Sequence, residues 1–190
     1  MVAHLSEAVP RFWLTDNAAL EQFLSLELET GLGLSVQAMI VSDVAGTSGV
    51  QAQAFSTSVL QTIRKSLTKL EVSAHTPASI WVHPTDFESI ELALSTVNAI
   101  EHLSLPFDAA ARRLWGTPLV VSTAVTPGVS YTIAAGAVGL NTDGRGAEVT
   151  WSEQSDADDW SHNLIRARCE GRYATSVYAP LGVVVGDLTA

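Results

Sequence analysis

Three arginines near the end of the chain lie two and four positions apart. Between residues 163 and 175 the sequence alternates, so that Arg166, Arg168 and Arg172 share one face of an extended segment with Glu170, while Cys169 falls on the opposite, apolar face. Charged groups on such a face either remain solvated or form ion pairs with a neighbouring chain. Isolated exposed pairs contribute at most about 1 kcal/mol each, but repeated pairs set register and partner choice. The pattern alone leaves both interpretations open.

Residue types that catalyse reactions or bind metals are present, but their spacing is not typical of either site. Asp156, Asp158 and Asp159 lack the glycine and the terminal glutamate of a calcium loop, so a solvated turn is the preferred interpretation. Ser48 has no flanking strand of the kind that forms a nucleophile elbow. The histidines are scattered, without an i, i+4 pair or a neighbouring cysteine: His4, His75, His83, His102 and His162. We therefore expect no catalytic residue, no metal site and no cofactor, and we do not expect an enzyme.

Composition limits the class of partner. The 190 residues include 20 acidic and 10 basic ones, a formal charge of −10 that disfavours general electrostatic binding of nucleic acid. The single cysteine, Cys169, is expected to be a small buried hydrophobe in a reducing compartment. The N-terminus does not resemble a secretory signal, and we expect no apolar run long enough to span a membrane. No membrane partner is expected.

A long helix dominates the first part of the chain. Apolar residues recur at spacings of three and four over residues 18–41, which predicts a helix of about 35 Å at 1.5 Å per residue. Asp16 or Asn17 can cap its start. No other predicted helix is long enough to form a bundle with it.

The remaining elements mix helices and strands, which predicts an α+β chain in two lobes. The alternating strand over 163–175 ends before Pro180, and residues 181–185 are predicted to form a short apolar strand that pairs beside it. Residues 42–53, 95–111 and 154–160 are predicted as connecting segments. Further helices are predicted over 56–70 and 83–94, and further strands over 79–82, 114–122, 131–140 and 147–153.

Four blocks of sequence, in order, resemble one family. They are HLSEAVPRFWLTDNAALEQFLSLELETGLGLSVQAMIV, IWVHPTDF, LWGTPLVVSTAVTPG and LIRARCEGRYATSVYAPLGVVVGDL. Together they resemble the major capsid proteins of tailed phages of the Hong Kong 97 type, whose shell fold is shared with encapsulins. The resemblance implies a long spine helix, a peripheral β-rich domain and an axial α/β domain. It places the end of the extended loop and the spine helix in 1–45, the axial domain in 46–128, and the return strand and peripheral sheet in 129–190.

The sequence also departs from that pattern. Such shell proteins carry an N-terminal arm, the outgoing strand of the extended loop and often a scaffolding segment ahead of the spine helix, and these have no counterpart in the residues at hand. We therefore expect the chain to keep its two lobes but to lose much of its ability to close a shell unaided.

The resemblance implies a structural subunit of a phage or prophage icosahedral capsid. It would self-assemble into pentamers and hexamers that enclose double-stranded DNA without reading its sequence. Portal, scaffold or protease proteins would be partners during assembly, in the host cytoplasm, and the finished subunit would reside in the virion. On this view Arg166, Arg168 and Arg172 form an interface between subunits. The alternatives are an encapsulin-type compartment shell and, from another class, a small α+β enzyme or binding module.

The resemblance also implies a covalent link. In cross-linking members of the family a lysine on the extended loop of one subunit joins an asparagine on the peripheral domain of another, helped by a glutamate. Asn163 and Glu170 match those two positions here. They lie in opposite phase along the strand, so one chain is not expected to present both to the same point.

Overall fold

The computed structural model describes residues 1–94, 107–108 and 112–189. Most of the predicted connector over 95–111 therefore lies outside the described residues. The chain forms two compact units. The first comprises Met1–Met39 and Leu140–Ala174, and the second comprises Ile40–Gly139 and Thr175–Ala190.

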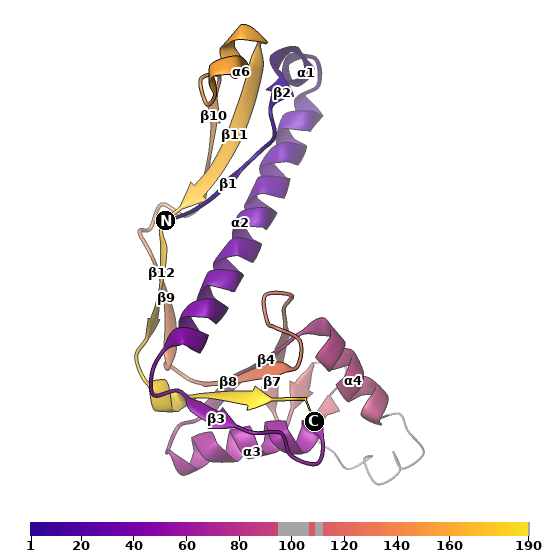
Figure 1. Ribbon diagram of the computed structural model, residues 1–190, viewed down its shortest axis with the longest axis vertical. Coiled ribbons are helices and arrows are strands. Elements are labelled where there is room, and N and C mark those ends of the chain that lie inside the picture. The colour runs from indigo at the N-terminus through magenta and orange to yellow at the C-terminus, as the bar shows by residue number, and fades with distance from the viewer. Residues whose placement is uncertain (95–106, 109–111, 190) are drawn as a thin grey trace. The chain divides into compact units, whose positions relative to one another are not determined.

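The predicted long helix is α2, Ala18–Gly46 (Figure 1). The Asn17 side chain accepts a hydrogen bond from the backbone N–H of Ala19 at 3.1 Å, and the short helix α1, Arg11–Asp16, precedes it. α2 continues five residues beyond the predicted end, because Val41 and Val44 extend the apolar spacing and are buried in the core of the second unit. The predicted loop over 42–53 is correspondingly shorter and ends in strand β3, Gln51–Gln53.

By length and composition α2 is apolar enough to cross a membrane, so the prediction that no apolar run is long enough to do so was wrong. Leu28 and Leu32 of this helix are buried in a protein core, and the core helix of a globular protein passes the same test.

In the first unit an antiparallel sheet packs against α2. Its order is β1, Val2–Leu5, then β11, Leu164–Gly171, then β10, Glu148–Ser152; β2, Val9–Pro10, also pairs with β11. Ala167 and Cys169 of β11 lie on the inner face and form a core with Leu28 and Leu32. The alternation that predicted a packed face and a charged face is confirmed along β11.

The predicted single strand over 163–175 is two strands. β11 ends at Gly171, and β12, Tyr173–Val177, pairs instead with β9, Val138–Thr142. A Cβ atom at position 171 would lie 2.5 Å from the Tyr173 ring. The backbone and this ring are therefore so close at the break between the two strands that glycine, which has no side chain, fits there.

The second unit contains, within the described residues, a seven-stranded sheet in the order β3-β13-β8-β4-β7-β6-β5. Helix α3, Val59–Val72, packs on β13 and β8. Its N-cap is Ser58, whose hydroxyl accepts from the N–H of Gln61. Helix α4, Pro84–Leu94, begins with the predicted first-turn proline. The other strands are β4, Pro77–Val82; β5, Phe107–Asp108; β6, Arg113–Leu114; β7, Thr117–Val121; and β8, Val129–Ala134.

The predicted partner of the last strand was wrong. β13, Val183–Asp187, lies between β3 and β8 in the second unit and does not pair with the 163–175 segment. Val183 and Val184 are both fully buried, although adjacent strand residues point to opposite faces. A strand that is apolar on both faces is stable in the centre of a covered sheet rather than beside a half-exposed strand.

The predicted segment 129–190 divides between the two units, since residues 140–174 belong to the first unit and its remaining residues to the second. The assignment of the three predicted segments to peripheral and axial roles stays a prediction.

Two glycines in α2 provide a matched test of its packing. Gly33→Ala is expected to raise the free energy of unfolding by about 0.5–1 kcal/mol, because alanine favours helix and no atom beyond the helix's own nearby backbone lies within 4 Å of the new Cβ. Gly31→Ala is expected to gain less, since its Cβ would lie 2.6 Å from Nε2 of His4 and the ring would have to move. Urea unfolding of the two variants measures the difference. A larger gain at position 31 would contradict the packing described for β1 on α2.

Candidate functional site

The outer face of the β1–β11–β10 sheet carries the predicted charged residues. On β11 these are Arg166, Arg168 and Glu170, and each lies opposite a residue of β10: Ser152, Thr150 and Glu148, respectively. Glu148 and Glu170 are like charges in directly paired positions, an arrangement that disfavours the sheet unless a cation lies nearby. Arg168 provides that cation, with its Nη2 atom 3.1 Å from Oε1 of Glu170.

Arg166 belongs to the interior of its own unit. Its Nε atom donates to Oδ2 of Asp159 at 2.9 Å, and Nη2 donates to Oδ1 at 3.3 Å. The Asp159 side chain is 1% exposed and that of Arg166 is 24% exposed. The hydrogen bond to Asp159 raises the pKa of Arg166 above its usual value. Arg166 is therefore bound within its own chain, and a role for it at an interface between subunits stays a prediction.

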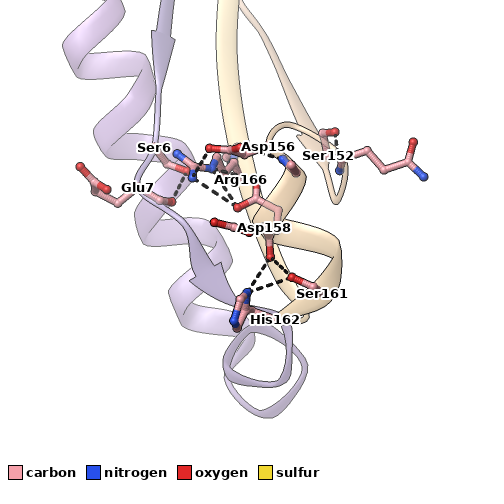
Figure 2. A network of polar contacts seen from close by, with 12 residues as sticks. Ser6, Glu7, Ser152, Asp156, Asp158, Ser161, His162 and Arg166 are labelled. Carbon is pink, nitrogen blue, oxygen red and sulfur yellow. Dashed lines mark hydrogen bonds and ion pairs between the residues drawn. The ribbon is translucent and has the colours of Figure 1, made fainter.

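The partner carboxylate comes from α6, Ala157–Ser161, in the segment that was predicted to be a solvated acidic turn. Asp156 caps this helix by accepting from the N–H of Ala157 at 2.7 Å, and it lies 3.7 Å from Arg166. Figure 2 shows Arg166 beside Asp156, with Ser6 of the first unit close by. The prediction of a solvated turn is thus wrong for Asp159, because one helical turn directs its side chain onto β11.

Ser6 and His162 make further polar contacts beside the Asp159–Arg166 pair. Ser6 accepts from the N–H of Ala167 at 2.9 Å and its own N–H donates to the Ala167 carbonyl, which joins the end of β1 to the middle of β11. Nδ1 of His162 lies 3.0 Å from the hydroxyl of Ser161 and 3.0 Å from the carbonyl oxygen of Asp158 (Figure 2). His162 thereby closes the C-terminal end of α6.

Arg168 and Arg172 remain accessible. Their side chains are 50% and 77% exposed, and the closest described carboxylate to Arg172 is that of Asp143, at 4.0 Å. The three arginines that looked equivalent in the sequence are therefore one structural residue and two surface residues.

Asn163 and Glu170 lie at opposite ends of β11. Seven residues separate them, roughly 20 Å along an extended strand, so the fold does not bring them together within one chain. Asn163 is exposed and adopts φ +54°, a left-handed conformation that asparagine tolerates, at the junction between α6 and β11. Its carbonyl accepts from the N–H of Arg11 at 3.1 Å. With Arg11, Glu153 and Trp160 it lines a hollow of about 140 Å³.

Cys169 is fully buried, as predicted. Burial, with the nearby Glu29 carboxylate, raises the pKa of its thiol. A buried protonated thiol is a poor nucleophile and a poor metal ligand. Among residues 1–94, 107–108 and 112–189 no group of three histidine, cysteine or acidic side chains is placed to hold a metal ion.

Sequence reasoning missed the exposed aromatic residues of this unit. Phe12, Trp13 and Trp160 are each more than 60% exposed, although residues of this size are usually at least partly buried. The adjacent pair Phe12 and Trp13 beside Pro10 was visible in the sequence, but its exposure was not.

No family model and no curated protein matches the sequence. Solved structures do match the fold. A Gordonia phage Cozz structure superposes with a TM-score of 0.72 at 15% identity, over 100% of this chain and 70% of that one. The virus-like particle from Pyrococcus furiosus gives 0.69 at 13% identity, over 97% and 74%. The structure of the major capsid and decoration proteins of phage G gives 0.70 at 8% identity, over 99% and 71%.

The chain has the Hong Kong 97-type capsid fold. The predicted α+β class with a long N-terminal helix is thereby confirmed. At 8–15% identity these matches show the fold alone, and they leave the roles of individual residues to be argued from this chain.

Proposed function

We propose that this chain is a structural subunit of a phage or prophage icosahedral shell. The observation that carries the proposal is that essentially the whole chain, and not one lobe of it, matches structures of a virus-like particle and of phage capsids, with 97–99% of its residues covered. The subunit acts through repeated contacts between copies rather than through a catalytic pocket. Copies form pentamers and hexamers that enclose double-stranded DNA, and the subunit resides in the virion after assembly in the host cytoplasm with portal, scaffold or protease proteins.

The charge of the chain supports enclosure without tight binding. A formal charge of −10 repels the phosphate backbone, so a packed genome is held by the closed shell and is not adsorbed to it. An encapsulin-type compartment uses the same fold around an enzyme cargo. The neighbouring genes separate the two, because terminase and portal genes accompany a DNA-filled shell and a cargo-enzyme gene accompanies a compartment.

Mass measurement of the purified chain across a range of concentrations tests the proposal. We expect oligomers with five and six times the 20.1 kDa of the chain, seen as rings by negative-stain electron microscopy. A chain that stays monomeric at every concentration would overturn the proposed function.

Asn163 is proposed as the acceptor of an inter-subunit cross-link. In such a link a lysine Nζ attacks the side-chain carbonyl carbon of the asparagine, an amide bond forms and ammonia leaves. The two lysines of the sequence, Lys65 and Lys69, are both on α3, where Nζ of Lys65 donates to the hydroxyl of Ser56 and Nζ of Lys69 donates to the carbonyl of Ala52. A link to Asn163 therefore draws on one of these amines or on a lysine of another polypeptide.

Denaturing gels of assembled material test the cross-link. We expect covalent ladders that Asn163→Ala abolishes and that Val72→Ala, at an exposed position of α3 outside the hollow that Asn163 lines, preserves. Ladders that persist in Asn163→Ala would exclude this residue as the acceptor. Assembled material that runs only as a single-chain band would show that the shell is held without covalent links.

A further inference from the structure

Strand β10, Glu148–Ser152, is an edge strand of the first unit (Figure 1). One of its edges pairs with β11 along all five residues, and within the described residues no strand pairs with the other edge. An unpaired edge presents backbone N–H and C=O groups that a strand of another chain can bind. Edge strands are commonly protected from such pairing by a lysine, a proline or a bulge. β10 has none of these three features.

The sequence of β10 is complementary to itself. Two copies can pair antiparallel about a two-fold axis at Thr150, which is the register that pairs all five residues. Val149 of one copy then lies opposite Trp151 of the other, and an aromatic residue opposite a β-branched one is a favourable cross-strand pair, as are two threonines. Glu148, the charged residue of the strand, lies opposite Ser152, so no like charges meet.

The same register makes both faces of the sheet continuous between the two copies. Val149 and Trp151 are half-buried and pack against the core that Leu28 and Leu32 form with β11. Pairing about Thr150 brings these apolar side chains of the two copies together on the inner face and removes more of their surface from water. A slip of one residue would instead place apolar side chains of one copy opposite polar side chains of the other.

We propose that β10 of one copy pairs antiparallel with β10 of a second copy about a two-fold axis at Thr150. The partner is a second copy because the complementarity is that of the strand with itself. A two-fold contact uses the same surface on both copies and closes on itself, whereas a ring of subunits requires contacts between different surfaces. This contact therefore joins a subunit of one ring to a subunit of another. That role rests on the proposed function, whereas the strand pairing itself does not.

Cysteine substitutions test the pairing and its register. Opposite residues of an antiparallel pair have Cα atoms about 4.5–5.5 Å apart, a separation that a disulfide spans. We expect Thr150→Cys, treated with oxidised glutathione, to form a dimer of twice 20.1 kDa on non-reducing denaturing gels. Glu148→Cys and Ser152→Cys are expected to give a dimer only when mixed, because these positions lie opposite each other across the axis. The wild type controls for Cys169, which is buried.

A charge at position 150 separates the contact from folding. Within one chain the carboxylate of Thr150→Glu lies opposite Arg168, an attractive cross-strand pair, so urea unfolding is expected to show no loss of stability. Across the two-fold axis it lies opposite a second carboxylate. Added to both the Glu148→Cys and the Ser152→Cys chains, Thr150→Glu is expected to slow disulfide formation in their mixture about fivefold. The uncharged control Thr150→Gln is expected to slow it less.

The outcomes separate the inference from the proposed function. If the wild type forms rings and Thr150→Cys gives no disulfide-linked dimer, the inference is overturned and the proposed function stands. Dimers linked through Thr150→Cys in a chain that forms no rings would support the strand pairing and count against the proposed function. If Glu148→Cys alone forms dimers as fast as Thr150→Cys, the register is wrong. If Thr150→Glu weakens association but Thr150→Cys gives no disulfide, another strand occupies the edge and the two-fold pairing is overturned.

Discussion

Replacing Arg166 by leucine is expected to lower the free energy of unfolding by about 3 kcal/mol, because the fully buried Asp159 carboxylate would lose its partner. This figure is the low end of the range for a broken buried pair, since the Arg166 side chain is 24% exposed and water can reach the site in part. Urea unfolding measures the loss. Because α6 is attached to β11 through this pair, we also expect faster amide exchange in residues 157–161.

Two comparisons make the prediction specific. Arg168→Leu, two residues further along the same face, removes an exposed pair and should cost less than about 1 kcal/mol. In the double variant Asp159→Leu/Arg166→Leu both charges are gone, so the double variant should be more stable than Arg166→Leu alone. Equal losses for Arg166→Leu and Arg168→Leu would show that Asp159 and Arg166 contribute no more than a surface pair.

The Asp159–Arg166 pair also shows what strand alternation leaves unspecified about the charged face. Alternation places a residue on one face of a strand, but it does not say what covers that face. Here α6 turns back over Arg166, and its third residue, Asp159, reaches the guanidinium seven positions away in sequence. The run of acidic residues looked like a solvated turn because a five-residue helix is too short to show a helical period.

The long elements were predictable because each of them repeats its period several times. α2 contains eight helical turns of apolar residues at regular spacing, and β11 alternates for eight residues, so that each carries enough repeats to define its period. The break after Gly171 carried no such signal, because alternation continues across it while the pairing partner changes from β10 to β9. The position of β13 depended on a partner, β8, about fifty residues upstream, which periodicity cannot specify.

The candidate site also combines features that the sequence predicted with features that it did not. The exposure of Arg168 and Arg172 and the burial of Cys169 followed from strand phase alone. The exposed aromatic residues Phe12, Trp13 and Trp160 come from α1 and α6, and two residue pairs of the β2–β11 ladder join the segments that lead into α1 and out of α6. Contacts between distant segments of the chain decide which surface groups are available for assembly, and these are the contacts that sequence patterns do not specify.

Gly182→Ala is expected to destabilise the second unit by about 2 kcal/mol through overpacking. A Cβ at position 182 would lie 2.8 Å from Cβ of Ala137 and 3.1 Å from Cδ2 of His75. A Cβ atom is fixed to the backbone and cannot rotate away, so η1, Pro180–Gly182, must shift from the turn after β8. β13 begins at the next residue and lies in the interior of the sheet, so the shift is transmitted to the core at Val183.

A second substitution shows whether the Cβ contact is the cause. Glycine-to-alanine changes at open positions usually stabilise a protein by about 0.4–1 kcal/mol through the unfolded chain, so a loss at position 182 must arise in the folded state. Ala137→Gly removes the opposing Cβ at a modest cost of its own. If the two Cβ atoms collide, Gly182→Ala costs less in the Ala137→Gly background than in the wild type, and thermal unfolding of the four proteins measures this coupling directly. Additive losses would place the strain elsewhere, at the His75 ring, which contacts the same position.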